Sequence, residues 1–226
     1  MALTDEAITK LRSMIQSGEL PPGSRLPSEN QLAAQMGLSR SGVREAVKVL
    51  EAARVLEVRR GDGTFVTSLA PKLLLAGVGF AVELLQGETL LEVMEVRRLL
   101  EPAATGLASL RVTEEQLADL EKLLTYMEDA RDDAEELMAA DVAFHRTVIA
   151  STGNETLSSL LDGLSSRTVR ARVWRGVVEG NVTQTTLDEH RAIYLALKSR
   201  DPFLATSAAL MHVNTSESWL RARLHG

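Results

Sequence analysis

The sequence contains no cysteine among its 226 residues. That absence excludes disulfide bonds, cysteine-ligated zinc sites and thiol nucleophiles. The chain also has no apolar run that approaches the roughly 20 residues that a membrane-spanning helix needs. Its first ten residues carry charge and lack the apolar core of a signal peptide. We therefore expect a cytoplasmic protein with no membrane partner.

Aromatic side chains make up only 4% of the chain, so its cores must be built mainly from leucine, valine and alanine. Leucine and alanine favour helices, whereas aromatic and β-branched residues favour sheets. Hydrophobic residues account for 45% and charged residues for 25%, as in ordinary soluble globular proteins. Because 226 residues exceed the length of a typical single domain, two mainly helical domains are expected.

Basic residues are outnumbered, and the formal net charge is −6. The charge is distributed unevenly. Residues 1–70 hold nine basic and eight acidic residues, whereas the remainder holds sixteen and twenty-three. Within residues 40–60, six basic residues stand against three acidic ones. A basic stripe beside an acidic domain suits a DNA-binding module joined to a second domain, although charged helix faces are usually only solvated.

Helix boundary signals near the N-terminus indicate a helix-turn-helix. A first helix is predicted from Thr4. Ser28, with Gln31 three residues later, forms a capping-box pattern for a second helix that closes at Gly37. Ser39 then caps a third helix, which has a regular apolar stripe. Two short helices joined by a tight, glycine-containing turn are typical of the helix-turn-helix motif.

Two short strands are predicted directly after the third helix, at residues 55–58 and 64–67. The segment between them, Arg59-Arg60-Gly61-Asp62-Gly63, is rich in hairpin-turn residues. A hairpin that follows a helix-turn-helix is a wing. Residues 1–68 are thus predicted to be a winged helix-turn-helix DNA-binding domain of three helices and a β-hairpin.

The start of the third helix carries the residues that we expect to meet DNA bases. In a helix-turn-helix, the N-terminal residues of the second helix of the motif approach base edges in the major groove. Arg40 and Arg44 are four residues apart and share one helix face, and arginine is the commonest reader of guanine. Ser39 and Ser41 can donate hydrogen bonds to phosphate. The alternative is that the two arginines are surface residues of a generic helix.

Residues 20–66, LPPGSRLPSENQLAAQMGLSRSGVREAVKVLEAARVLEVRRGDGTFV, resemble the winged helix-turn-helix of the GntR family almost position by position. The resemblance implies operator contacts from the third helix, from a residue early in the preceding helix, and from the tip of the wing. The matching residues are Asn30, Arg40, Ser41, Arg44, Arg60 and Gly61. Asn30 departs from the family pattern, in which a basic residue is common at this position.

Helices are predicted along all of the chain beyond a short linker. They span residues 72–86, 89–109, 113–129, 134–150, 154–176, 184–199 and 202–223. Gly77 and Gly79 weaken the first of them, because glycine is a poor helix former. Residues 69–226 are therefore predicted to form an all-α antiparallel bundle of six or seven helices, which binds an effector and dimerises.

Four side chains in the helical half could bind a metal ion. Asp141 and His145 are four residues apart in one predicted helix, so they project side by side. His190 and His212 lie on two later helices. One carboxylate and three imidazoles suit a divalent cation such as Zn, Ni or Mn. On spacing alone the alternative is the commoner case, because a lone histidine in a helix is usually a surface or satisfied core residue.

Residues 90–215 resemble the FCD effector domain of the FadR subfamily of GntR regulators. The resemblance is carried by EVMEVRRLLEPAATGLAS, DVAFHRTVIASTGNETL, DEHRAIYLALKSRDP and the late Met-His pair. It implies a divalent metal ion held by Asp141, His145, His190 and His212, with a small organic acid as effector. The carboxylate of such an effector can bind the metal and pair with an arginine.

Candidate effector contacts are Arg97, Arg170, Arg172 and Asn214. Arg97 lies in the motif that matches the first helix of the FCD domain, and the other two arginines lie on its predicted fifth helix. Asn214 follows His212 by two residues. For Arg97 the alternative is a surface ion pair with Glu95 or Glu101.

These patterns together predict a ligand-responsive, DNA-binding transcription regulator and not an enzyme. We expect a repressor that binds a short inverted repeat in double-stranded operator DNA as a homodimer. One alternative is a regulator whose C-terminal domain only dimerises or binds a larger, metal-independent ligand. A remote alternative is a metal-dependent enzyme, but no obvious general acid or base accompanies the metal motif.

Overall fold

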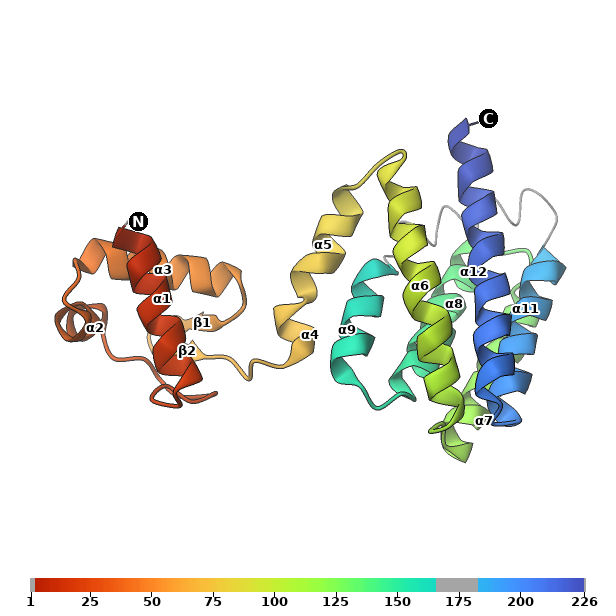
Figure 1. Cartoon of the computed structure of the whole chain (residues 1–226), viewed down its shortest axis with the longest axis horizontal. Helices are drawn as coiled ribbons and strands as arrows, with labels where there is room; N and C mark the ends of the chain where they lie inside the picture. The colour runs from red at the N-terminus through yellow and green to blue at the C-terminus, as the bar shows by residue number, and fades with distance from the viewer. Residues whose placement is uncertain (1–2, 166–182, 226) are drawn as a thin grey trace. The chain divides into compact units, whose positions relative to one another are not determined.

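The computed structural model describes residues 3–165 and 183–225. They belong to two compact units, Met1–Leu74 and Leu75–Gly226, each described here by itself. The first unit contains α1 (Leu3–Gln16), α2 (Glu29–Met36), α3 (Arg40–Ala52), β1 (Leu56–Arg59), β2 (Gly63–Val66) and α4 (Pro71–Leu74) (Figure 1). The second contains α5 (Ala76–Leu84), α6 (Thr89–Ser109), α7 (Glu114–Asp129), α8 (Ala134–Ala150), α9 (Glu155–Leu164), α11 (Thr183–Lys198) and α12 (Pro202–His225). The predicted fold class is confirmed: a winged helix-turn-helix precedes an all-helical bundle.

Short-range hydrogen bonds set the ends of α2 and the start of α3. The Ser28 hydroxyl accepts the Gln31 N–H, and the Gln31 side chain accepts the Ser28 N–H at 2.9 Å, which completes the capping box. Gly37 ends α2 in the left-handed conformation, with φ 68°. The Ser39 hydroxyl then accepts the Gly42 N–H at 3.2 Å and begins α3. These caps fix the tight turn that aims the start of α3 outward.

The core of the first unit is built from aliphatic side chains and includes no aromatic ring. Helices α1 and α2 both pack on α3, whose buried stripe includes Val43, Val47 and Leu50. The wing is an antiparallel pair in which Leu56 faces Val66, and both of these side chains are buried. Each strand is shifted by one residue from its predicted range, because the ladder closes at Arg59 opposite Gly63.

The segment that leaves β2 is bonded back to the first unit. Thr67 donates its hydroxyl to the carbonyl of Arg54 at 2.8 Å, and the same hydroxyl accepts the N–H of Leu69 at 3.3 Å. The Thr67 N–H also bonds to the carbonyl of Val55 at 3.0 Å. Leu69 adopts a positive φ of 54° and packs against the core of the first unit.

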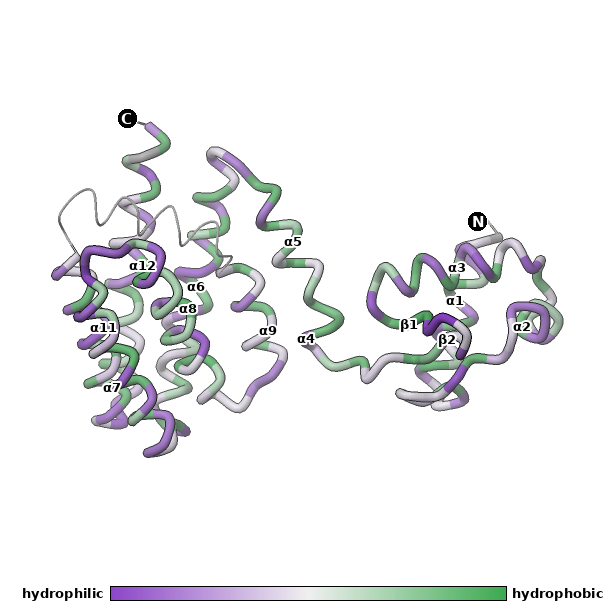
Figure 2. The backbone as a smooth tube through the Cα atoms, turned by 180° about the vertical axis from the view of Figure 1, so that it is seen from behind, coloured by the Kyte–Doolittle hydropathy of each residue, from purple (hydrophilic) through white to green (hydrophobic). Residues whose placement is uncertain are grey.

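The second unit has two apolar clusters that share α12. One cluster lies mainly among α7, α8, α11 and α12 and includes Ala108 of α6, and the other lies mainly among α5, α6, α9 and α12 and includes Ile149 of α8. Helix α12 packs along α6 and beside α11. Hydrophobic and hydrophilic residues alternate along most of these helices, as amphipathic packing requires (Figure 2). None of the described helices combines the length and the apolar character needed to cross a membrane.

Two predicted helix ranges differ from the structure by more than one or two end residues. The predicted helix at 72–86 is divided into α4 and α5, which part at Leu75. Helix α5 contains Gly77 and Gly79, which lower helix propensity. A Cβ built on Gly163 of α9 would lie 3.1 Å from the backbone nitrogen of Gly79 in α5, so Gly163 allows the two helices to pack closely. Helix α9 ends at Leu164 with Ser165 as its C-cap, and residues 166–176 of the predicted range lie outside the described residues.

Candidate functional site

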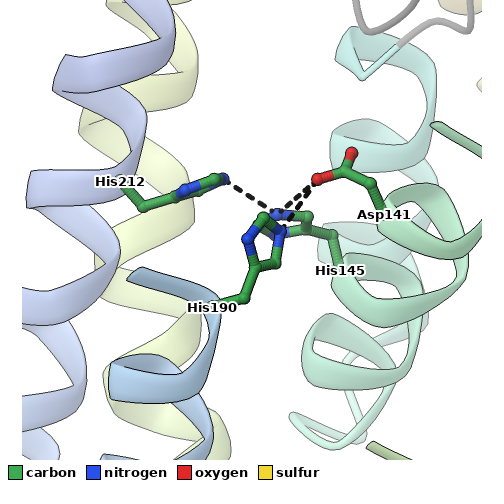
Figure 3. A group of neighbouring side chains, drawn as sticks. All are labelled: Asp141, His145, His190 and His212. Atoms are coloured by element: carbon green, nitrogen blue, oxygen red, sulfur yellow. Dashed lines mark hydrogen bonds and ion pairs between the residues drawn. The ribbon is translucent and has the colours of Figure 1, made fainter. Parts of the chain in front are cut away.

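Three helices of the second unit bring one carboxylate and three imidazoles together. Asp141 and His145 lie on α8, His190 lies on α11 and His212 lies on α12 (Figure 3). Their exposed fractions are 3%, 7%, 0% and 2%, so the cluster is almost fully buried. One candidate ligand atom from each residue lies within 4.8 Å of all the others. The structure therefore brings together all four predicted metal ligands.

Packing around the cluster explains how these polar groups are held in an apolar interior. The spacing of four residues places Asp141 and His145 on one face of α8. Phe144 lies between them in sequence, and its ring stands edge-on to His145 and His190, at centroid distances of 5.6 and 5.1 Å. An aromatic wall of this kind limits the access of water to the cluster.

His190 has a tautomer that the structure defines. Its Nδ1 lies 2.8 Å from the carbonyl oxygen of Thr186. Because a carbonyl can only accept, Nδ1 donates its proton there. The Nε2 atom then faces the cluster and lies 2.9 Å from Oδ1 of Asp141.

His212 is held in the same way by a carboxylate. Its Nδ1 donates to Oε2 of Glu189 at 3.1 Å, and the other oxygen of Glu189 accepts the Thr215 hydroxyl at 2.5 Å. The Nε2 atom of His212 lies 3.2 Å from Nε2 of His145. Burial, and after it the neighbouring His190, lowers the pKa of His212 below its ordinary value of 6.5. The ring is therefore neutral at pH 7, as a metal ligand must be.

This donor set fits a divalent cation. Histidine ligands commonly donate one ring nitrogen to a carbonyl or carboxylate and offer the other to the metal, as His190 and His212 do here. Two ligand atoms that each lie about 2.1 Å from one ion are between about 3 and 4 Å apart. The separations of 2.9, 3.2 and 3.5 Å within the cluster are close to this range.

Glu189 is a functional candidate that the sequence analysis did not identify. It stands directly before His190 but bonds to His212, on a different helix. An acidic residue beside a candidate ligand is a weak signal for such a role. The pairing of α11 with α12 decides which histidine it reaches, and that pairing is a property of the fold.

Arg97 of α6 is buried and not at the surface. Its Nε and Nη2 atoms donate to the two oxygens of Glu101 at 2.6 and 3.2 Å, and both side chains are about 98% buried. The predicted alternative partner Glu101 is thus present, but the ion pair lies in the interior. Burial alone lowers the pKa of Arg97, but the charges of Glu101 and Asp141 outweigh this effect and raise it.

The remaining effector candidates are not brought to the cluster in the described part of the chain. Asn214 is exposed and lines a surface hollow along α12 with Thr215, Ser218, Trp219 and Ala222. Two residues along a helix correspond to about 200° of rotation, which separates Asn214 from the face of His212. Arg170 and Arg172 lie outside the described residues.

The predicted DNA contacts lie in two places on the first unit. Ser39, Arg40, Ser41 and Arg44 cap or begin α3, and both arginine side chains are exposed and contact Glu29 of α2. Asn30 is exposed in the first turn of α2. Arg60 and Gly61 lie at the tip of the hairpin, where Gly61 adopts a positive φ of 80°. Sequence analysis did not single out Glu29.

A winged helix-turn-helix joined to a helical unit with a buried aspartate-histidine cluster defines a class of DNA-binding regulators. Residues 3–66 match the model of bacterial regulatory proteins of the gntR family, and residues 92–215 match the FCD domain. The chain therefore belongs to the GntR family, in the FadR-type subfamily with an FCD domain. It is a family of transcription regulators, so the predicted class is confirmed and the enzyme alternative loses its support.

Similar proteins cover nearly the whole chain. The galactonate operon transcriptional repressor of Escherichia coli K12 is 34% identical over an alignment of 226 positions, which covers 96% of this chain and 96% of the repressor. The HTH-type transcriptional regulator LutR of Bacillus subtilis 168 is 32% identical and covers 92% of this chain and 96% of its own. A solved structure of Streptococcus agalactiae GntR is 31% identical, with a TM-score of 0.64 and coverage of 95% and 99%.

Proposed function

We propose that this protein is a metal-dependent repressor whose affinity for its operator is controlled by a small carboxylate. The observation that carries the proposal is the buried cluster of Asp141, His145, His190 and His212, in a chain that also has a winged helix-turn-helix. An unliganded cluster of this polarity would be costly in an apolar interior. A site for a ligand accounts for its presence better than a purely dimerising domain does.

The four residues of the cluster would hold the metal ion, with zinc, nickel or manganese as candidates. When bound, the ion would supply a Lewis-acid centre at which carboxylate oxygens of an effector are favoured. The chain itself contributes the orientation of the ligands, through Thr186 for His190 and Glu189 for His212. We propose that the buried Arg97–Glu101 pair, whose arginine has its pKa raised by the charges of Glu101 and Asp141, would respond to a charged ligand.

The names of similar proteins support an organic acid as the effector. The relative from Escherichia coli is named for the galactonate operon, and galactonate is a small hydroxy acid. A carboxylate with a neighbouring hydroxyl group suits a metal with open coordination positions. For this chain we propose an effector of that chemical class, which contacts the metal and Arg97, with Arg170, Arg172 and Asn214 as further candidate contacts.

Operator recognition is proposed for residues 1–68, and effector binding and dimerisation for residues 69–226. Within the first segment, Arg40 and Arg44 would read bases while Ser39, Ser41 and Asn30 contact the flanking backbone or bases. Arg60 and Gly61 would enter the minor groove. Exposed apolar side chains on the adjoining helices α6 and α12 support a homodimer, which would read an inverted repeat. These are Val96, Leu99, Leu110, Phe203, Leu204, Leu210 and Met211.

The metal site is tested by elemental analysis of untagged wild-type protein, with His145→Ala and His225→Ala beside it. His225 is an exposed histidine that bonds to Glu88 and lies outside the cluster, so it is a matched control. We expect about one divalent metal ion per chain in wild type and His225→Ala, and a loss in His145→Ala. Wild-type protein that neither contains nor takes up a divalent metal would overturn the proposal.

A further inference from the structure

One carboxylate bridges the two arginines at the start of α3. Oε2 of Glu29 accepts hydrogen bonds from Nη2 and Nε of Arg44 at 3.0 and 3.1 Å, and Nε of Arg40 at 3.4 Å. Oε1 of Glu29 also accepts from Nε of Arg44 at 3.3 Å. A single side chain at the first position of α2 therefore holds both of the exposed arginines of α3.

The position of Glu29 is unfavourable for attracting DNA. A carboxylate among side chains that approach phosphate opposes binding to any sequence. It also contributes little to folding, because its side chain is 34% exposed, that of Arg44 is 47% exposed, and exposed ion pairs are weak. Hydrogen bonding from Arg44, which outweighs partial burial, lowers the pKa of Glu29 and keeps it ionised. Neither general DNA affinity nor stability accounts for this arrangement.

The hydrogen bonds to Glu29 instead hold the guanidinium groups of Arg44 and Arg40 in one orientation. Arginine reads guanine through two parallel N–H groups, and this requires its planar guanidinium group to be held at one angle. Glu29 engages Nε and Nη2 of Arg44, which leaves Nη1 outside these bonds. An arginine that is already fixed loses less side-chain entropy when it meets the matching base. A free arginine can instead turn to the nearest phosphate, whatever the sequence.

We propose that Glu29 is a positioning residue that determines sequence specificity: it fixes Arg44 and Arg40 for base reading and lowers affinity for DNA in general. The inference rests on the proposed function of Arg40 and Arg44 as readers of operator DNA. Glu29 is thus expected to favour binding to the operator sequence and to oppose binding to DNA of any other sequence.

The test begins with selection of a binding site from random-sequence duplexes by the full-length wild-type protein. Affinities of wild type, Glu29→Gln and Glu45→Gln are then measured for the selected site and for a scrambled duplex of equal length. Glu45 is the matched control, because it is an exposed acid on α3 that pairs with Lys48 and forms no hydrogen bond to Arg40 or Arg44. Both substitutions remove one negative charge.

Glu29→Gln is expected to bind the scrambled duplex at least as tightly as wild type, while its preference for the selected site falls at least about 5-fold. Glu45→Gln should tighten both complexes to the same extent and keep the preference. A selection repeated with Glu29→Gln should return a more degenerate site. Folding damage would instead weaken both complexes and lower the melting temperature.

Two results would overturn the inference. The first is an unchanged preference in Glu29→Gln, and the second is a parallel loss of binding to both duplexes. If wild type enriches no site at all, the proposed reading role of Arg40 and Arg44 fails first, and the inference fails with it. Enrichment by wild type with an unchanged preference in Glu29→Gln overturns the role of Glu29 alone.

Discussion

Two imidazole rings of the cluster, those of His190 and His212, differ in what holds the ring nitrogen that points away from the other ligands. His190 is anchored by a backbone carbonyl of its own helix, whereas His212 is anchored by the Glu189 side chain of a neighbouring helix. The first anchor forms with the helix itself. The second depends on one carboxylate and can be removed without changing any ligand.

Glu189→Gln is therefore expected to weaken metal binding while leaving all four ligands in place. Loss of a group that orients a metal ligand typically lowers affinity about 10- to 100-fold. Competition with a chromophoric chelator measures the change. Asp188→Asn is the matched control, because Asp188 is exposed on α11 and bonds to Gln184. Equal metal affinities for wild type and Glu189→Gln would remove this role from Glu189.

Sequence spacing could place only part of the cluster. The separation of four residues puts Asp141 and His145 on one helix face in any fold. The spacing says nothing about whether His190 and His212 reach that face, so on the residues alone a metal site and ordinary core histidines remained alternatives, and the family resemblance favoured the metal site. The role of Glu189 could not be foreseen, because it depends on how α11 and α12 are aligned along their lengths.

At the scale of helices, the close approach of α6 and α12 is the feature that supports the site. A Cβ built on Gly106 would lie 2.3 Å from Oγ1 of Thr206 and 3.0 Å from the carbonyl of Pro202. A backbone carbonyl cannot turn aside as a side chain does. The missing side chain at Gly106 thus sets the spacing between α6 and the helix that carries His212.

Gly106→Ala should push α12 away from α6, destabilise the protein by about 1–3 kcal/mol and weaken metal binding. Gly77→Ala is the matched control, because no described atom lies within 4 Å of its added Cβ. Alanine in the interior of α5 should raise stability by up to about 1 kcal/mol. Urea unfolding measures both changes. Equal effects of the two substitutions would show that the helix spacing does not matter.

The sequence predicted the helices best where caps mark their ends. Ser28 and Ser39 begin α2 and α3 as predicted, because a side chain and a backbone N–H three residues later suffice to define each start. The division between α4 and α5 was not predicted. Nothing local marks Leu75 as a break, and the contact of Gly79 with Gly163 joins segments far apart in sequence.

At the scale of the whole molecule, two cores are expected to respond separately to metal. The first unit is held by its own aliphatic cluster, and the candidate metal ligands all belong to the second. Calorimetry of metal-stripped protein should show that added zinc raises the unfolding temperature of the second unit. The free energy of unfolding of that unit should increase by about 2.7 kcal/mol at a zinc concentration 100 times the dissociation constant. The transition of the first unit should not move.

His145→Ala provides the control for this measurement, since its second transition should be insensitive to zinc. A single transition that shifts as a whole would contradict independent cores. It would indicate instead that the two units unfold cooperatively.

The hydrogen bonds of Thr67 determine which part of the chain can act as a pivot. Because they tie the segment after β2 to the carbonyls of Arg54 and Val55, a torque on the chain beyond Ala70 should turn the recognition helix and the wing as one body. In the proposed dimer, each recognition helix would therefore move together with its own wing. Since one helical turn of DNA is about 34 Å long, such rigid movements would bring the two recognition helices in or out of register with successive major grooves.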